Sequence, residues 1–258
     1  MSDRLTYGSY LKVDELLALQ RPLSKPAHHD ELLFIVIHQV YELWFKQLLH
    51  ELDAVVRALD ADDLLRVAKL FRRIHTIQRL IETQVDVLET MSPQEFNQFR
   101  DHLNPASGFQ SIQFRELEFL CGVRRLDTMA HILMDDGQRA RLERRLAEPS
   151  LYERLQALLR RRGFVFSDSE GLIAAFREIY TQESKHYDLH LLLEDLIELD
   201  ERLLLWRGRH VRMVERMIGH KHGTGGSLGV DYLAKTLGAK MFPELWDVRT
   251  YLGSETYG

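Results

Sequence analysis

The sequence has little of the residues that interrupt helices, with 6 prolines and 15 glycines among 258 residues. Alternating runs of β-branched residues bounded by turns are also missing, so no strand is expected. Leucine, arginine and glutamate, which have good helix propensity, dominate the composition. The chain is 45% hydrophobic and 28% charged, which allows both a full core and solubility. We therefore predict an all-α fold, a bundle of long amphipathic helices that forms one domain over residues 1–258.

The single cysteine, Cys121, excludes an intramolecular disulfide and is typical of a reducing compartment. The start of the chain, MSDRLTYGSYLKVDELL, has no apolar core long enough for a signal peptide. No run approaches the ~18 apolar residues that a membrane span needs. A net charge of -5 gives no reason to expect nucleic acid. These absences favour a cytoplasmic protein with neither a nucleic acid nor a membrane as partner.

The longest predicted helix runs from Glu183 to Gly219. Its apolar positions recur at helical spacing, and between Trp206 and Met213 the place of an apolar residue is taken by His210. The neighbouring arginines, Arg207 among them, fall on other faces of the helix. A histidine on such a stripe is either a core side chain satisfied by a neighbour or an axial ligand of a metal or haem.

A second long helix is predicted from His28 to Leu59, and it repeats this feature. Its inward stripe contains His38, one turn after Phe34. Two helices that each carry an inward histidine are what a bundle enclosing a cofactor would produce. The pair therefore strengthens the interpretation that the bundle holds a haem or a metal.

Other metal sites are weakly supported by the histidine spacing. Glu183 and His186 form one ExxH unit, whereas a carboxylate-bridged di-iron bundle needs two. His186 and His190 share a helix face, but no HExxH motif or cysteine partner accompanies them. One cysteine cannot form the CxxCH attachment of a c-type haem. A haem would therefore be held without covalent attachment, through a histidine.

Shorter elements complete the predicted bundle. A short amphipathic helix from Val13 to Gln20 follows a polar segment, and a third long helix covers residues 62–90. Ser92 is expected to cap the next helix, which has proline at its first position and Glu95 completing the capping arrangement. That helix carries Phe96, Phe99 and Arg100 toward a Pro/Ser/Gly turn.

Residues 124–170 differ in character, and we interpret them as a small helical excursion of two or three short helices. The arginines between Arg139 and Arg162 could form an RNA-binding face. Glutamates are interleaved with them and stacking aromatics are scarce, so a solvated helical face is favoured. Further on, the glycine-rich loop HKHGTGGSLG, with Thr224 at its centre, could hold an anion on its backbone amides.

Five blocks of the sequence together resemble the tryptophan 2,3-dioxygenase family in its compact bacterial form. The resemblance extends from Tyr7 to Tyr251 and is weakest in residues 124–170. The blocks occur in the family's order and read YGSYL, HHDELLFIVIHQVYELWFKQLLHEL, FRDHLNPASGFQSIQFRELEFL, LWRGRHVRMVERMIG and GTGGSLGVDYL.

This resemblance implies an all-helical enzyme with haem b as cofactor, active in its ferrous form and usually a homotetramer. Its substrates would be L-tryptophan and O2. Both oxygen atoms would be inserted across the indole C2–C3 bond, giving N-formyl-L-kynurenine. That reaction is the first step of tryptophan degradation by the kynurenine pathway.

The resemblance also assigns roles residue by residue. His210 matches the proximal ligand of the haem iron, and His38 matches the distal catalytic histidine that hydrogen-bonds the indole N–H. Phe34 matches the ring packed beside that histidine. Arg100 matches the residue that pairs with the substrate carboxylate, and Thr224 matches a contact to the amino-acid end of the substrate.

Four further positions follow from the same resemblance. Ser107 matches a residue near the haem. Tyr7, Tyr10 and Leu11 match a segment that closes the pocket of a neighbouring subunit, so residues 1–27 are expected to dock there.

Two positions depart from relatives of this family. Phe96 lines the substrate site where some bacterial members carry a tyrosine, which removes one hydroxyl from the carboxylate site. Val85 stands where a relative has tryptophan. The first departure concerns substrate affinity and leaves the reaction unchanged.

Three alternatives remain open at this stage. A related enzyme could use the same haem site on another indole. A haem sensor or carrier could ligate iron through both His210 and His38 without turnover, although it would have no need of Arg100 as a carboxylate clamp. A structural bundle could contain both histidines as core residues.

Overall fold

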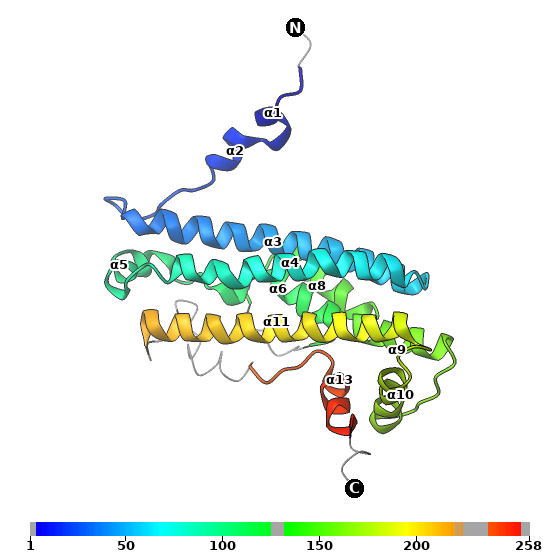
Figure 1. Ribbon diagram of the computed structural model, residues 1–258. Helices are drawn as coiled ribbons and strands as arrows, with labels where there is room; N and C mark the ends of the chain where they lie inside the picture. The colour runs from blue at the N-terminus through cyan, green and yellow to red at the C-terminus, as the bar shows by residue number, and fades with distance from the viewer. Residues whose placement is uncertain (1–3, 125–131, 220, 222, 224–236, 254–258) are drawn as a thin grey trace.

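The computed structural model describes residues 4–124, 132–219, 221, 223 and 237–253, and within them every regular element is a helix. The predicted all-α class is therefore confirmed. Three long helices lie side by side: α3 (His29–Asp60), α4 (Leu64–Leu88) and α11 (Tyr187–Ile218) (Figure 1). The middle helix, α4, packs along both of the others.

The predicted boundaries hold for α3 and α4 but not for α11. At the start of α4 the side chain of Asp63 accepts the backbone N–H of Arg66 at 3.1 Å, a local cap that sequence predicts well. The helix α11 begins at Tyr187, four residues after the predicted start. The backbone of His186 is not helical (φ −124°, ψ 33°), and its N–H bonds the carbonyl of Gln182 at 3.2 Å. A turn therefore competes successfully for these residues.

Shorter helices surround this frame. At one end, near the start of α3 and the ends of α4 and α11, lie α5 (Pro93–Phe99), η1 (Arg100–Leu103) and η2 (Gly108–Gln110). Against the other part of the frame lie α6 (Ile112–Cys121), α8 (Asp136–Ala147), α9 (Leu151–Arg161), α10 (Ser169–Thr181), α13 (Pro243–Asp247) and η3 (Val248–Tyr251).

The buried apolar side chains form two main clusters along the frame. The larger, here called the closed end, contains fully buried residues such as Phe71, Ile74 and Leu196. The smaller, here called the site end, comprises Ile37, Val85, Leu88, Met91, Phe99, Met213 and Met217. Tyr41 and Trp206 pack against both clusters.

The segment 124–170 is attached to the frame by apolar and charged contacts. Leu155 of α9 is fully buried in the closed end. Arg145 makes two hydrogen bonds to the carboxylate of Asp53, at 2.6 and 2.8 Å, and Arg154 pairs with Asp60. These carboxylates belong to the last turns of α3. The arginine row is therefore partly engaged with the bundle, beyond the solvated face that its interleaved glutamates suggested.

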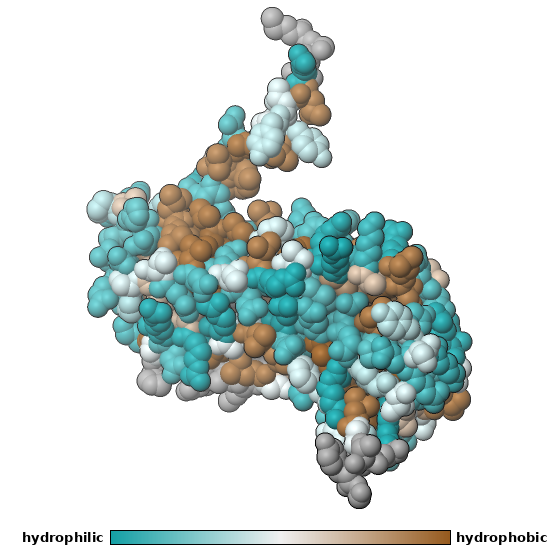
Figure 2. All heavy atoms as spheres, in the orientation of Figure 1, coloured by the Kyte–Doolittle hydropathy of each residue, from teal (hydrophilic) through white to brown (hydrophobic). Residues whose placement is uncertain are grey.

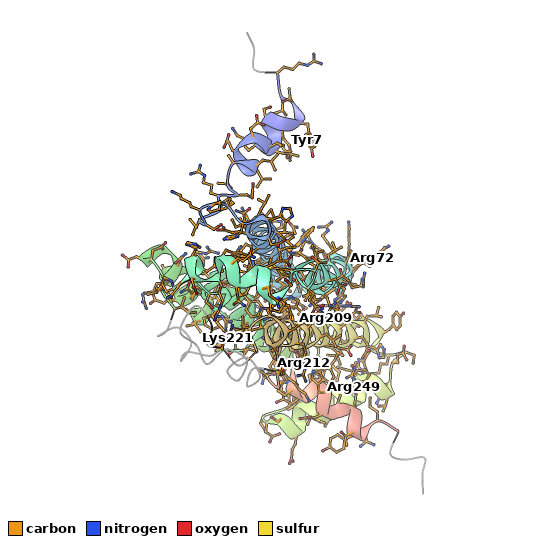
Figure 3. All side chains as sticks on the ribbon, turned by 90° about the vertical axis from the view of Figure 1, so that its left-hand side faces the viewer. Tyr7, Arg72, Arg209, Arg212, Lys221 and Arg249 are labelled. Carbon is orange, nitrogen blue, oxygen red and sulfur yellow. The ribbon has the colours of Figure 1, made fainter. Side chains whose placement is uncertain are left out.

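The N-terminal arm, residues 4–23, leaves the body of the molecule. It holds two short helices, α1 (Tyr7–Leu11) and α2 (Val13–Leu17), neither of which contains a buried residue. The predicted helix to Gln20 thus ends three residues early. Figures 1 and 3 show the arm, with Tyr7, projecting away from the three long helices.

The helix α3 has an exposed apolar face near the base of this arm. Among the described helices it alone reaches the length and hydropathy of a membrane span, and 22% of its most apolar window is buried. Leu32, Val36 and Leu43 are 48%, 38% and 52% exposed, and they share one face of the helix. Figure 2 shows apolar side chains gathered on the arm and on the body beneath it.

Candidate functional site

The site end brings His210 of α11 and His38 of α3 close enough to interact electrostatically. Burial, with a smaller contribution from the nearby His38, lowers the pKa of His210 to about 4. The residue keeps part of its surface accessible, and no described residue forms a hydrogen bond to its ring. His210 is therefore a neutral imidazole at pH 7, with a nitrogen lone pair that no described residue uses.

His38 is held in one tautomer by its own helix. Its Nδ1 lies 2.7 Å from the backbone carbonyl oxygen of Phe34, which can only accept a hydrogen bond. Burial lowers the pKa of His38, which keeps the ring neutral at pH 7. The proton of the neutral ring is therefore assigned to Nδ1. That leaves Nε2 as a hydrogen-bond acceptor for an N–H group of a ligand.

Three phenylalanines form an aromatic wall beside His38. The ring of Phe34 lies 4.1 Å from the imidazole, 5.7 Å from Phe96 and 5.6 Å from Phe99, measured between centroids. Phe96 and Phe99 meet edge to face at 5.4 Å. Phe99 is fully buried and was not assigned a site role from the sequence. Its spacing of three residues from Phe96, on one helix face, was the available signal.

Arg100 is positioned by the short helix α5. The hydroxyl of Ser92 accepts the backbone N–H of Glu95 at 3.3 Å, and the Glu95 carboxylate accepts the N–H of Ser92 at 2.7 Å. This confirms the predicted capping box. Because the cap fixes where α5 begins, it also fixes where Phe96 and the half-buried Arg100 lie, one turn and two turns along. Arg100 thus follows Phe99, the last residue of the aromatic wall, directly in the chain.

Four other predicted site residues are not brought into this group, and a fifth, Thr224, lies outside the described residues. Ser107 caps η2, and its described hydrogen bonds stay within residues 107–110. The remaining three belong to the exposed arm, where they are 79%, 71% and 44% exposed: Tyr7, Tyr10 and Leu11.

The residues present fit a haem. A bare metal ion in a protein is usually held by three or more side chains, and the described residues contain no such group of His, Cys, Asp or Glu. A haem needs one axial histidine with a free lone pair, which His210 provides, and apolar surroundings, which the aromatic wall and the methionines of the site end provide. His38 has the free nitrogen that a second axial ligand would also need.

A buried ion pair near His210 was missed in the sequence. Arg207 is 5% exposed and donates to Glu118 of α6 at 2.8 Å, with Glu118 3% exposed. The sequence placed Arg207 on a face other than the apolar stripe, which is correct, but that face is also buried. Glu118 within the apolar stretch of α6 was the only signal. The pair fixes α11 against α6 one turn before His210.

Comparison with known proteins gives one consistent family. The family described as tryptophan 2,3-dioxygenase matches residues 1–178 and 147–252 of this chain. A protein of that name from Nocardioides sp. is 48% identical over 254 residues, covering 96% of this chain and 95% of the relative. One from Herpetosiphon aurantiacus is 49% identical over 262 residues, covering 98% and 100%. One from Myxococcus xanthus is 44% identical over 268 residues, covering 98% and 91%.

Proposed function

The chain belongs to the tryptophan 2,3-dioxygenase family, and from this premise we propose how its site end carries out that reaction. The protein is an oxidoreductase that inserts both atoms of O2 across the indole C2–C3 bond of L-tryptophan, giving N-formyl-L-kynurenine. The observation that supports the site best is His210, a neutral, half-buried imidazole on the inward stripe of α11 that has no hydrogen-bond partner among the described residues. Its nitrogen lone pair is therefore available to a ligand.

We propose that the imidazole of His210 would hold haem b. The haem would supply the redox chemistry that the reaction with O2 needs. The neutral state of His210 at pH 7 is what iron ligation requires, because a protonated imidazole has no lone pair to donate. The thioethers and rings of the site end would exclude water from the bound ring.

His38 would bind the indole N–H. Its Nε2 is an acceptor because Nδ1 donates to the Phe34 carbonyl, so one hydrogen bond fixes the other. The acceptor would orient the indole. It would also polarise the N–H bond and stabilise positive charge there as the C2–C3 bond reacts. Phe34 and Phe96 would pack on the indole ring, since both rings lie in the wall beside His38.

Arg100 would pair with the substrate carboxylate. A guanidinium presents two parallel N–H donors that match the two oxygens of a carboxylate. Phe96 next to it contributes an apolar edge without a hydroxyl. Thr224 is proposed, on the family resemblance alone, to contact the same end of tryptophan, and Ser107 to lie near the haem.

The arm would dock on a neighbouring copy of the chain. Its exposed Tyr7, Tyr10 and Leu11 have no apolar surface to pack on in their own chain, and the exposed face of α3 lacks a cover. Mutual docking would cover both surfaces, and we propose a homotetramer on the family resemblance. We propose a cytoplasmic location, and the free, fully buried Cys121 supports it because a reducing compartment keeps a thiol unpaired.

Purified protein reconstituted with haem tests the proposal. We expect a ferrous spectrum typical of one axial histidine, and conversion of L-tryptophan to N-formyl-L-kynurenine with one O2 consumed per product. A six-coordinate spectrum of two histidine ligands without turnover would instead support the haem carrier. Absence of haem binding would contradict the proposal altogether.

A further inference from the structure

Two aromatic residues form the boundary between the site end and the closed end. Trp206 lies one turn before His210 on α11, and Tyr41 lies one turn after His38 on α3. Their rings meet edge to face, 6.0 Å between centroids at 61°. They are the residues that pack against both apolar clusters. Contacts that hold Tyr41 and Trp206 in place therefore link the two histidines to the buried core of the closed end.

The indole of Trp206 is stacked on the imidazole of His210. The two rings are nearly parallel, at 15°, with centroids 5.5 Å apart. Trp206 is held in turn by Phe45 at 6.0 Å and by Phe114 of α6 at 5.1 Å. Rings from two other helices, α3 and α6, thus fix the plane of the indole.

No hydrogen bond from a described residue fixes the plane of the His210 imidazole in the way that neighbouring rings fix the indole. The torsion that turns a histidine ring about its Cβ–Cγ bond is intrinsically broad. A hydrogen bond from the second ring nitrogen usually sets that torsion in axial histidines, and none to His210 occurs among the described residues. Among the described residues, the ring stacked on His210 is that of Trp206, and this stack can select the plane of the imidazole.

We propose that Trp206 is the positioning residue that sets the orientation of His210 for ligation of the haem iron, with Tyr41 bracing the indole from α3. This inference rests on the proposed function, since it concerns how the axial ligand is presented. Burial is the main cause that raises the pKa of Tyr41 to about 12, and the nearby indole N–H of Trp206 lowers this pKa by a smaller amount. The brace is therefore a neutral phenol at any working pH, and it also donates to the carbonyl of Ile81 at 3.2 Å.

The test compares four haem-loaded variants in the ferrous state: Trp206→Leu, Trp206→Phe, Tyr41→Leu and Phe71→Leu. The first removes the stacked ring, the second keeps a smaller ring, and the third removes only the brace. Phe71→Leu is the matched control, because it removes a fully buried ring from the closed end without contacting Trp206 in the described structure. The readouts are the iron–histidine vibrational band in resonance Raman spectra and the rate of haem transfer to an excess of an apoprotein acceptor.

We expect Trp206→Leu to shift and broaden the iron–histidine band and to release haem about tenfold faster, the scale found when a group that orients a metal ligand is removed. Trp206→Phe should restore most of both properties, and Tyr41→Leu should move the band less but in the same direction. The control should lose thermal stability with an unchanged band. In turnover, Trp206→Leu should lower kcat while leaving the KM for tryptophan near the wild-type value, because Trp206 does not touch the proposed substrate wall.

An unchanged band in both Trp206→Leu and Tyr41→Leu would overturn the inference, as would an equal shift in the control. If Trp206→Leu fails to fold, Tyr41→Leu decides alone, because it leaves the indole present but unbraced. Failure of the proposed function looks different. In that case the wild-type protein itself would show no iron–histidine band. If only this inference fails, the wild-type protein shows the band, and substitution of Trp206 does not change it.

Discussion

The closed end and the site end are built from the same three helices, yet each buries a histidine in a different way. At the closed end, His75 is 5% exposed, and both of its ring nitrogens have partners. Its Nδ1 lies 3.2 Å from the amide oxygen of Gln78, and its Nε2 lies 3.2 Å from the carboxylate of Asp195. At the site end, His210 has no described partner. The two histidines therefore differ in whether described protein groups use both of their ring nitrogens.

The apolar packing differs in the same direction. The closed end is filled by side chains with no exposure at all, including Phe71, Ile74 and Leu196. At the site end the residues that face the histidines, Phe34 and Phe96, are only half-buried. The helical period is the same throughout. The site end differs because its inward-facing helix positions carry histidines and phenylalanines that the protein covers only in part.

The largest difference between the two ends is expected in haem content when His210 and His75 are each replaced by alanine. His210→Ala should abolish haem incorporation while leaving helix content by circular dichroism largely intact. His75→Ala should retain haem, and should reduce the free energy of unfolding by about 1–3 kcal/mol because the half-buried Asp195 and the buried amide oxygen of Gln78 lose their imidazole partner. Equal haem loss in both variants would remove the distinction between them.

The proposed role of Arg100 as the partner of the substrate carboxylate predicts the substrate specificity of the site end. Tryptamine, which lacks the carboxylate, should have a kcat/KM at least about a hundredfold below that of tryptophan. Two charge-assisted hydrogen bonds are lost, each worth about 1.5–3 kcal/mol, and 1.4 kcal/mol corresponds to a factor of ten. Arg100→Ala should narrow this gap by impairing tryptophan alone. Equal specificity constants for both substrates on the wild-type enzyme would show that Arg100 is not the clamp.

The closed end should respond to truncation in stability alone. Leu196→Ala removes a fully buried side chain, and should lower the free energy of unfolding by about 2–5 kcal/mol through lost burial and a residual cavity. Per folded molecule, the haem content and the kcat/KM for tryptophan should remain unchanged. Denaturant unfolding followed in parallel with activity measures both. A loss of activity that precedes unfolding would show that the two ends are energetically coupled.

His38 should influence turnover more gently than His210 influences haem binding. One hydrogen bond to the indole N–H is worth about 0.5–1.5 kcal/mol, so His38→Ala should retain haem and lose up to about tenfold in kcat/KM. Because burial places the pKa of His38 below its usual 6.5, the acceptor is present at neutral pH and disappears only on protonation in acid. The kcat/KM should therefore be level around pH 7 and fall below about pH 6.5. A fall beginning above pH 7 would contradict this assignment.

The smallest effect is expected from the arm, which belongs to neither end of its own chain. Deleting residues 1–12 should raise the KM for tryptophan several-fold, because the proposed partner pocket loses its cover, and should leave haem content unchanged. Steady-state kinetics, together with the molecular mass in solution, provide the measurement. Unaltered kinetics in a variant of unchanged mass would show that the tyrosines have no role in the pocket.

The parts of the fold that sequence predicted are those set by local interactions. The helices α3 and α4 and the cap at Ser92 follow from periodicity and from side chains within three residues of the backbone groups that they satisfy. The start of α11 was missed because a turn that bonds Gln182 competes with the first helical turn. Such a competition is decided by how α10 packs against α11, which local sequence does not encode.

The same distinction applies to the site. His38 and His210 were visible because each interrupts an apolar stripe. The pairing of Arg207 with Glu118 joins residues 89 positions apart in the sequence, so only the tertiary structure reveals it. The stack of Trp206 on His210 was present in the spacing, but a stripe residue usually packs in a core, and nothing local marks one that also orients a ligand. The docking of the arm remains a prediction.

The exposed apolar face of α3 has a consequence for how freely this stretch can vary in sequence. Between Leu32 and Leu43 the outward positions form the bare face, and the inward positions include Phe34 and His38. A substitution at an outward-facing position of α3 changes the surface available for docking. A substitution at an inward-facing position changes the pocket. Both faces belong to one continuous helix, so few positions of this stretch are free of both surfaces. We therefore expect this stretch to tolerate fewer substitutions than any helix of the closed end that has a solvent-facing side.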